Sequence, residues 1–384
     1  MRILLAPDKF KGCLTAAAVA EAMARGVHEV HPGIEIDSCP VADGGEGTVD
    51  ALVAATRGRI ETRRVTGPLP DMRVDARFGV LGDAETAVVE MSAASGLALL
   101  PPQDLDPMRT TTYGTGELLV EAAKLGVERI ILGIGGSATT DGGIGCAQAC
   151  GLPVILDDPA GPADVREPLV GEDLRRVVLI KHARGSRLDR VKITVACDVT
   201  NPLFGPNGAA RIFGPQKGAT PAQIDELDFL LRRLAERCGK LAEANEPGAG
   251  AAGGLGFAML AFFNANLRPG FDIVADAIRL RDRIKQCDCC LTGEGRLDAS
   301  SLAGKAAVGV ARACNNVGIP CAVIAGQIDE DFRRELDSAN DKLFAARYSL
   351  SDAASSSDQA IARAPDLIAA AAGEAIRRFA QHGP

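Results

Sequence analysis

The sequence contains no tryptophan, and aromatic residues make up only 4% of its 384 residues. Its core must therefore be built mainly from Ala, Val, Leu and Ile, and a hydrophobic fraction of 47% is enough for a substantial one. The sequence also lacks an apolar stretch that is long enough and free enough of charge to span a membrane. The first apolar run ends at Asp8 and is too short for a signal peptide. We expect a cytoplasmic protein with two domains or one large domain.

Positive charge and histidine are scarce. The formal net charge is −8, and no basic stripe is present that could displace counterions from nucleic-acid phosphates. With only four histidines, a histidine-based mechanism is unpromising. The 11 cysteines are odd in number and several lie in apolar runs, which indicates reduced thiols rather than a disulfide framework. Cys287 and Cys290 form a C-x-x-C spacing, but no second pair lies at zinc spacing, which favours core packing.

The common nucleotide-binding motifs are absent or weak. No G-x-x-x-x-G-K-[ST] segment occurs, so the chain is not a Walker-type kinase. The glycines between residues 248 and 253 match G-x-G-x-x-G, but they do not follow a predicted strand. A dinucleotide-dependent oxidoreductase remains one alternative function, and a non-catalytic protein that binds small acids is another.

Strands and helices alternate near both ends of the chain, which is typical of a parallel sheet. A strand at residues 2–6 precedes a helix at 16–30 that Thr15 can cap. After residue 287, short strands are predicted at 289–292, 321–325 and 343–346. We therefore expect a Rossmann-like α/β domain made of residues 1–60 and 285–384.

The middle of the chain has a different pattern. Residues 74–80 and 86–91 read as an antiparallel hairpin, and residues 223–243 as an amphipathic helix. The polar segment 157–190 is expected to be an excursion on the surface. Residues 61–284 are thus predicted to form an inserted domain of mixed α/β structure.

Charged and glycine-rich segments follow several predicted strands, where open α/β sheets bind their ligands. Each could be a simple turn, but their number favours a site. Backbone N–H groups can approach a phosphate where side chains are absent, and carboxylates can hold Mg²⁺ or accept a hydroxyl proton. The segments occupy residues 8–12, 43–48, 133–143, 198–208 with 216–218, and 292–298.

These segments resemble the signature sequences of the type I glycerate kinase family in order and spacing, over nearly the whole chain. The matching segments are APDKFKG (6–12), ADGGEGT (42–48), MSAASGL (91–97), TTYGTGELL (111–119), GIGGSATTDGG (133–143), CDVTNPLFGPNGAARIFGPQKGA (197–219) and TGEGRLD (292–298). The resemblance implies two different α/β domains with the active site in the cleft between them. It also implies ATP as the phosphate donor, D-glycerate as the acceptor and 2-phosphoglycerate as the product.

With that reaction in view, we predict a role for each charged side chain. Mg²⁺ is assigned to Asp198 and Glu294, and the proton of the glycerate hydroxyl to Asp43 or Asp298. Arg296 is expected to clamp the glycerate carboxylate, while Lys9, Lys11 and Lys217 face phosphate oxygens. The full predicted substrate- and phosphate-binding set is Lys11, Gly44, Gly45, Glu46, Gly135, Gly136, Ser137, Thr139, Asp141, Asn201, Gln216 and Lys217. Thr140 stands where the family commonly has Asn and is given no role. Both a monomer and a homodimer are compatible with the sequence.

Overall fold

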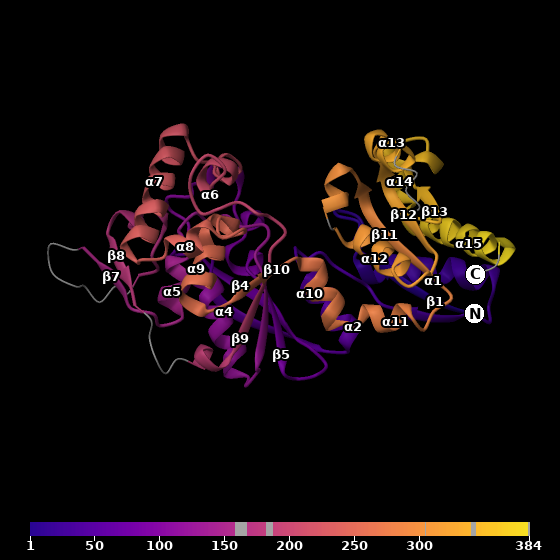
Figure 1. Ribbon diagram of the computed structural model, residues 1–384, viewed down its shortest axis with the longest axis horizontal. Helices are drawn as coiled ribbons and strands as arrows, with labels where there is room; N and C mark the ends of the chain where they lie inside the picture. The colour runs from indigo at the N-terminus through magenta and orange to yellow at the C-terminus, as the bar shows by residue number, and fades with distance from the viewer. Residues whose placement is uncertain (158–166, 182–186, 304, 339–342, 383–384) are drawn as a thin grey trace. The chain divides into compact units, whose positions relative to one another are not determined.

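The computed structural model describes residues 1–157, 167–181, 187–303, 305–338 and 343–382 (Figure 1). Contacts between residues divide the chain into two compact units. Unit 1 comprises residues 1–43, 50–57 and 271–384, and unit 2 comprises residues 44–49 and 58–270. The two-domain division expected from the sequence, with boundaries at 60/61 and 284/285, stays a prediction.

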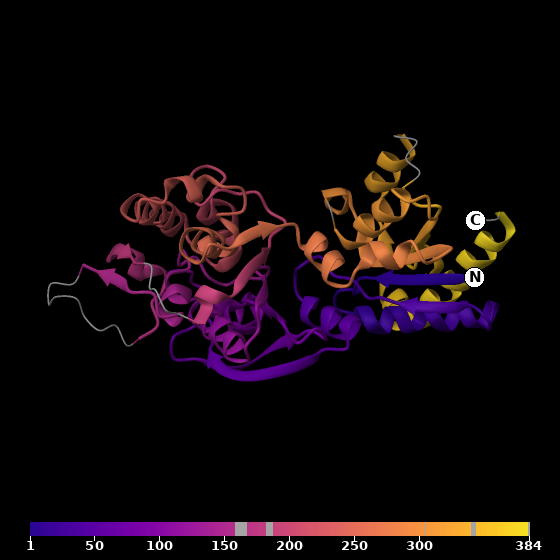
Figure 2. The same ribbon diagram turned by 60° about the horizontal axis from the view of Figure 1, so that its bottom comes forward.

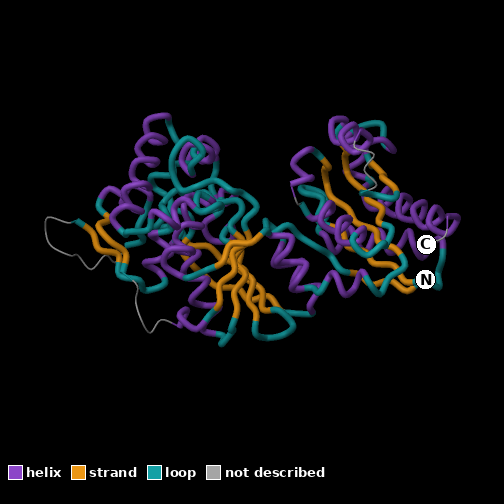
Figure 3. The backbone as a smooth tube through the Cα atoms, viewed as in Figure 1, coloured by secondary structure: helices purple, strands orange, loops and turns teal. Residues whose placement is uncertain are grey.

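Unit 1 is built on a five-stranded sheet in which every neighbouring pair is parallel, in the order β13-β12-β11-β1-β2. Figure 3 draws the strands of both units in orange. Its strands are β1 (Arg2–Pro7), β2 (Glu35–Ser38), β11 (Cys289–Leu297), β12 (Cys321–Ile328) and β13 (Ala346–Ser349). β1 pairs with β11, so the two ends of the chain meet at the centre of one sheet. The predicted Rossmann-like sheet from both chain ends is therefore confirmed. The last strand begins at Ala346, later than expected; residues 339–342 lie outside the described residues.

Helices cover both faces of this sheet. They are α1 (Ala16–Val30), α2 (Thr48–Thr56), α10 (Gly270–Ala277), α11 (Leu280–Ile284), α12 (Ala306–Asn315), α13 (Glu330–Ser338), α14 (Ser357–Ala362) and α15 (Ala364–His382). α1 and α15 lie side by side against one face, where Met23 and Ile368 join a core with Leu5 and Leu291 (Figure 2). α12 packs on β1, β11 and β12 from the other face.

The α1 helix forms where the sequence predicts it. The Thr15 side chain accepts a hydrogen bond from the Ala18 N–H at 3.2 Å, which caps the first turn. Its buried residues recur at helical spacing and face α15. Gly26 lies at the crossing, and a Cβ atom there would lie 1.8 Å from the carbonyl oxygen of Ala369. The two helix backbones can approach this closely only because the position has no side chain.

Unit 2 contains a six-stranded mixed sheet in the order β10-β9-β6-β5-β4-β3. Its strands are β3 (Arg59–Thr66), β4 (Arg73–Val80), β5 (Thr86–Glu90), β6 (Arg129–Gly133), β9 (Lys192–Ala196) and β10 (Asn266–Arg268). β4 and β5 are antiparallel, as predicted, whereas β5, β6, β9 and β10 run parallel. β3, which the sequence analysis missed, is an edge strand with many polar residues. A separate antiparallel pair is formed by β7 (Val154–Leu156) and β8 (Val177–Ile180).

The helices of unit 2 pack with this sheet around one large core. They are α3 (Ser92–Ser95), α4 (Tyr113–Lys124), α5 (Ile144–Ala149), α6 (Ala209–Phe213), α7 (Pro221–Arg237), α8 (Leu241–Asn245) and α9 (Leu255–Phe263). The helix predicted over 223–243 is broken into α7 and α8, because the chain turns at Gly239 with φ of +65°. The expected surface excursion at 157–190 is partly wrong: Leu169, Leu174 and Ile180 are buried in the core. Residues 158–166 and 182–186 of that segment lie outside the described residues.

Two general expectations can be compared with the structure. Within the described ranges, we find no helix with the length and apolar character needed to cross a membrane. All 11 cysteines are free thiols, and most of them are buried.

We expect Gly26→Ala to lower the free energy of unfolding by about 1–3 kcal/mol, since the added methyl group meets backbone atoms that cannot rotate away. The matched control is Gly33→Ala, whose Cβ would have only the His31 ring near it, at 3.8 Å. Urea unfolding of both variants measures the difference. Equal stability of the two would show that α1 and α15 separate without penalty.

Candidate active site

Acidic side chains gather at the carboxyl edge of the unit 1 sheet. Asp8 directly follows β1, and Glu294 lies on the neighbouring strand β11. The Asp8 N–H donates to the carbonyl oxygen of Gly293 at 2.8 Å, which continues the pairing of the two strands. The Thr292 hydroxyl donates to the carbonyl oxygen of Ala6 at 2.8 Å and ties the same strands together. The backbone thus holds Asp8 and Glu294 close to each other.

Burial makes the charged forms of these two carboxyl groups unfavourable. Burial raises the pKa of Glu294 from 4.5 to about 8; Lys305 opposes the rise, and the carboxylates of Asp8, Asp43 and Asp298 add to it. Burial and the Asp43 carboxylate raise the pKa of Asp8 from 3.8 to about 7. Like charges that share a water-poor site favour protons or a bound cation.

The ammonium group of Lys305 partly balances the negative charge of the cluster. Lys305 Nζ lies 3.5 Å from Asp298 Oδ1 and 3.8 Å from Glu294 Oε1. The Asp298 N–H donates to the Ser301 hydroxyl at 3.1 Å, which holds the turn after β11. Lys9 also lowers the pKa of Asp8, but two ammonium groups do not offset the four carboxyl groups of Asp8, Asp43, Glu294 and Asp298, so an added positive charge is favourable here.

The donor set fits a divalent cation. Glu294 Oε2 is buried, and the described part of the chain offers it no hydrogen-bond partner. Mg²⁺ prefers carboxylate and water oxygens and is usually bound through one or two carboxylates plus substrate phosphates. A buried, unpartnered carboxylate oxygen among further carboxylates is therefore a suitable ligand, as predicted for Glu294.

The basic residues predicted in unit 1 have different surroundings. The Arg296 guanidinium is engaged with Asp329, with Nε–Oδ1 and Nη2–Oδ2 distances of 3.0 and 2.7 Å. Its fork, which we expected to hold the glycerate carboxylate, therefore already has a carboxylate partner. The side chain of Lys9 is half-buried beside Asp8, and Lys11 is exposed.

A cavity of about 190 Å³ lies in unit 1 at the ends of β11, β12 and β13. Apolar side chains line most of it, with Lys11, Gln327, Ser351 and Ser357 as polar groups. Gly295 and Gly326, which follow Glu294 and Ala325, form its wall. The volume suits a ring system rather than a whole nucleotide.

In unit 2, two glycine segments meet at the carboxyl edge of the sheet. A Cβ atom at Gly133 would lie 2.7 Å from the carbonyl oxygen of Gly44, and one at Gly135 would lie 3.5 Å from the Cα of Gly45. Gly135 and Gly136 are exposed, and Ser137 is half-buried. The predicted phosphate-binding glycines are thus brought together, with backbone accessible at residues 135–137.

Asp141 holds the glycine loop instead of facing solvent. Its side chain is fully buried and accepts hydrogen bonds from the Thr112 N–H and hydroxyl at 2.8 and 2.7 Å. It also accepts from the N–H groups of Gly143 at 3.0 Å and Gly145 at 3.3 Å. Burial raises the pKa of Asp141, and these donors oppose the rise. A direct contact with phosphate would require this network to open, so the structure favours a positioning role.

Lys217 is likewise enclosed. Its side chain is 1% exposed, and Nζ donates to the carbonyl oxygen of Thr139 at 2.6 Å. Burial lowers the pKa of Lys217 to about 7, and Asp141 opposes the change. The hydroxyls of Thr139 and Thr140 are buried without a hydrogen-bond partner among the described residues. The ammonium supports the loop from inside, where we had expected it to face phosphate.

The remaining predicted residues lie in loops of unit 2. Asp198, two residues after the end of β9, accepts the Gly270 N–H with Oδ1 at 2.8 Å. Asn201 donates to the carbonyl oxygen of Asn207 at 2.9 Å and closes its own turn. Glu46 and Gln216 are exposed. Their contacts with a substrate stay predictions.

Asp8, Lys305 and Thr112 take part in these networks, but none of them was in the predicted set of site residues. Asp8 lies inside a segment that was singled out, but its two lysines seemed the better phosphate ligands. Lys305 lies downstream of residues 292–298, and Thr112 lies within a matched segment. A search for ionisable residues at every strand end would have found Asp8. Lys305 was a weaker candidate from the sequence, because the stretch 300–304 before it is less typical of the family, and Thr112 becomes visible only through its contacts.

Comparisons with known proteins agree on one family. The model of the glycerate kinase family matches residues 3–380. A glycerate kinase of Haemophilus influenzae is 46% identical over 92% of this chain and 93% of its own. A glycerate 2-kinase of Escherichia coli is 46% identical over 86% of each chain. A crystal structure of glycerate kinase 2 from Salmonella typhimurium superposes with a TM-score of 0.85, with 41% identity and full coverage of both chains.

The raised pKa of Glu294 has a consequence for stability. Between pH 4.5 and about 8 the folded protein binds more protons at this residue than the unfolded chain, so its contribution to stability falls as pH rises. Glu294→Gln removes this dependence, and the variant should be more stable than the wild type by a margin that grows from pH 5 to about pH 8. Thermal unfolding across this pH range measures the margin.

Glu330→Gln, which changes an exposed glutamate of α13, is the control and should show no such trend. A margin that is constant with pH, or that shrinks as pH rises, would contradict the assignment of a raised pKa.

Proposed function

The chain belongs to the glycerate kinase family, and from that premise we propose that it transfers the terminal phosphoryl group of ATP to the 2-hydroxyl of D-glycerate. The products are 2-phosphoglycerate and ADP. The relative from Escherichia coli that is named a glycerate 2-kinase supports position 2 as the site of transfer. Family membership gives no support to the two alternatives, the dinucleotide-dependent oxidoreductase and the non-catalytic protein that binds small acids.

The main structural support for phosphoryl transfer is the buried carboxylate cluster of unit 1. Phosphoryl transfer depends mainly on positioning and on neutralising the charge of the phosphate oxygens. We propose that Glu294 holds Mg²⁺, with Asp8 and Asp43 as its neighbours. When bound, the ion would supply positive charge to the phosphate oxygens. Asp198, the second ligand predicted from the sequence, stays a prediction.

The same cluster offers a group that accepts the proton of the glycerate hydroxyl. A general base works best when its pKa lies near the working pH. Asp43 and Asp298 were the predicted bases, and Asp8, with its pKa raised to about 7, meets this condition as well. We propose Asp8 as an additional candidate. Lys9 and Lys305, which lie beside these carboxylates, would attract the anionic substrates.

The cavity at the ends of β11, β12 and β13 suits the nucleoside part of ATP. Its apolar lining can hold a flat ring, and Lys11 at its border carries charge for phosphate. The exposed glycine backbone at residues 135–137 is proposed to bind anionic groups of the substrates through its N–H groups.

The reaction is tested by ³¹P NMR of the protein with ATP, Mg²⁺ and D-glycerate. We expect ADP to form only when glycerate is present, and 2-phosphoglycerate to be the first product. Glu294→Gln should lower kcat by roughly two or more powers of ten, because charge neutralisation is lost, while Glu330→Gln keeps it. First appearance of 3-phosphoglycerate would overturn the position of transfer, and ATP turnover that is indifferent to glycerate would overturn the substrate.

Ser351→Trp tests the nucleoside cavity. The indole would fill space beside Lys11 and Gln327, so the KM for ATP should rise about tenfold or more, as for loss of one good contact. The KM for glycerate should change little. Ala353→Trp, in the same turn but outside the lining, is the control. A rise in the KM for glycerate alone would assign the cavity to the acid.

A further inference from the structure

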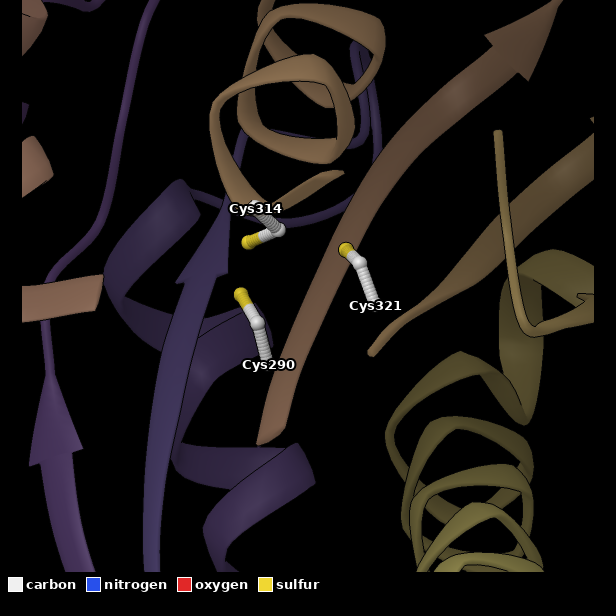
Figure 4. A group of neighbouring side chains, drawn as sticks. All are labelled: Cys290, Cys314 and Cys321. Atoms are coloured by element: carbon white, nitrogen blue, oxygen red, sulfur yellow. The ribbon is translucent and has the colours of Figure 1, made fainter. Parts of the chain in front are cut away.

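Three cysteine side chains meet inside unit 1, away from the carboxylate cluster. Cys290 lies near the start of β11, Cys314 in the last turn of α12 and Cys321 at the start of β12 (Figure 4). Their sulfur atoms all lie within 4.8 Å of one another. The amino ends of β11 and β12 carry this group, whereas Glu294 lies further toward the carboxyl end of β11.

The fold brings these residues together by a simple route. Cys290 and Cys321 are register partners on neighbouring parallel strands, so their side chains project from the same face of the sheet. α12 is the crossover helix between these strands and contacts both of them, which places Cys314 over the pair. Cys289, one residue earlier, faces the opposite side and belongs to the core with α1 and α15.

The surroundings are those of a sulfur-only site. Cys290 and Cys314 are 0% exposed and Cys321 is 1% exposed. The described residues place no histidine or carboxylate in the same group of potential ligands. A trigonal ion with metal–sulfur bonds of about 2.3 Å needs sulfur–sulfur distances of about 4.0 Å, and the separations here, all within 4.8 Å, are compatible with that requirement. Thiolates without oxygen ligands select soft cations such as Cu(I) or Zn(II).

We propose that Cys290, Cys314 and Cys321 form a binding site for a soft, thiophilic metal cation. Binding replaces each S–H bond that takes part with a metal–sulfur bond and releases its proton to solvent, with no change in oxidation state. The connection at residues 316–320, between α12 and β12, is tied to the cysteine group: the Ile319 N–H donates to the carbonyl oxygen of Cys314 at 3.0 Å, and the Cys290 N–H donates to that of Pro320 at 2.9 Å. This inference is independent of the proposed kinase reaction.

The test uses the full-length, reduced protein and Cd²⁺ as the probe. Titration is followed through the ultraviolet sulfur-to-metal charge-transfer band, and ¹¹³Cd NMR reports how many sulfurs bind the ion. We expect one tightly bound ion with a three-sulfur shift. The double variant Cys314→Ala, Cys321→Ala should lose about one equivalent of tightly bound Cd²⁺.

The matched control is Cys146→Ala, Cys150→Ala, which removes two buried cysteines from unit 2 and should keep the three-sulfur signal. Circular dichroism checks that each variant folds. If the alanine variant fails to fold, the single variant Cys321→Ser and the ¹¹³Cd shift of the wild type still decide the question. Absence of a three-sulfur signal in the wild type, or its survival in a folded variant of the cluster, would overturn the proposal.

Discussion

The parallel pairing of β1 with β11 is the interaction on which the candidate site depends. It joins the first residues of the chain to residues 289–293, and Ala6 lies beside Thr292 in its register. A shift of one residue would turn Asp8 or Glu294 to the other face of the sheet, because side chains alternate along a strand. The apolar residues of β1 and β11 stabilise this register through burial on both faces, as in other parallel sheets. The hydrophobic core therefore decides which carboxylates meet.

The close approach of Asp8 and Glu294 lowers the stability of the folded chain. Carboxyl groups that would be ionised in water are placed where burial and mutual repulsion favour their neutral form. The arrangement persists because the pairing of the surrounding strands fixes these positions. Ligands that carry positive charge lower its electrostatic cost. A cation bound together with a phosphate group would compensate Glu294 for the hydration that its carboxylate loses on burial. The local instability of the cluster and its suitability for phosphoryl transfer have the same electrostatic origin.

In unit 2, by contrast, the buried ionisable groups have hydrogen-bond partners. Asp141 and Lys217 are both enclosed, yet each is paired with backbone groups of neighbouring loops. They hold the glycine-rich segment in one shape and leave residues 135–137 accessible. A Cβ atom at Gly253 would lie 2.0 Å from the carbonyl oxygen of Thr139, so a second glycine segment packs tightly against the same loop. Asp141 and Lys217 thus position the glycine loop, and we propose that its backbone N–H groups meet the substrates.

Periodicity and turn residues in the sequence determined the secondary structure of most of the chain, including the capped helix α1 and the β4–β5 hairpin, because these depend on neighbours in sequence. Sequence motifs likewise indicated the family and the loops that carry polar residues. Only the tertiary structure decided what each side chain does: Arg296 is engaged with Asp329, Lys217 is buried beneath the glycine loop, and Asp8 joins Glu294. The sequence could not decide these points, since burial and charge pairing arise between residues that are distant along the chain and adjacent only after folding.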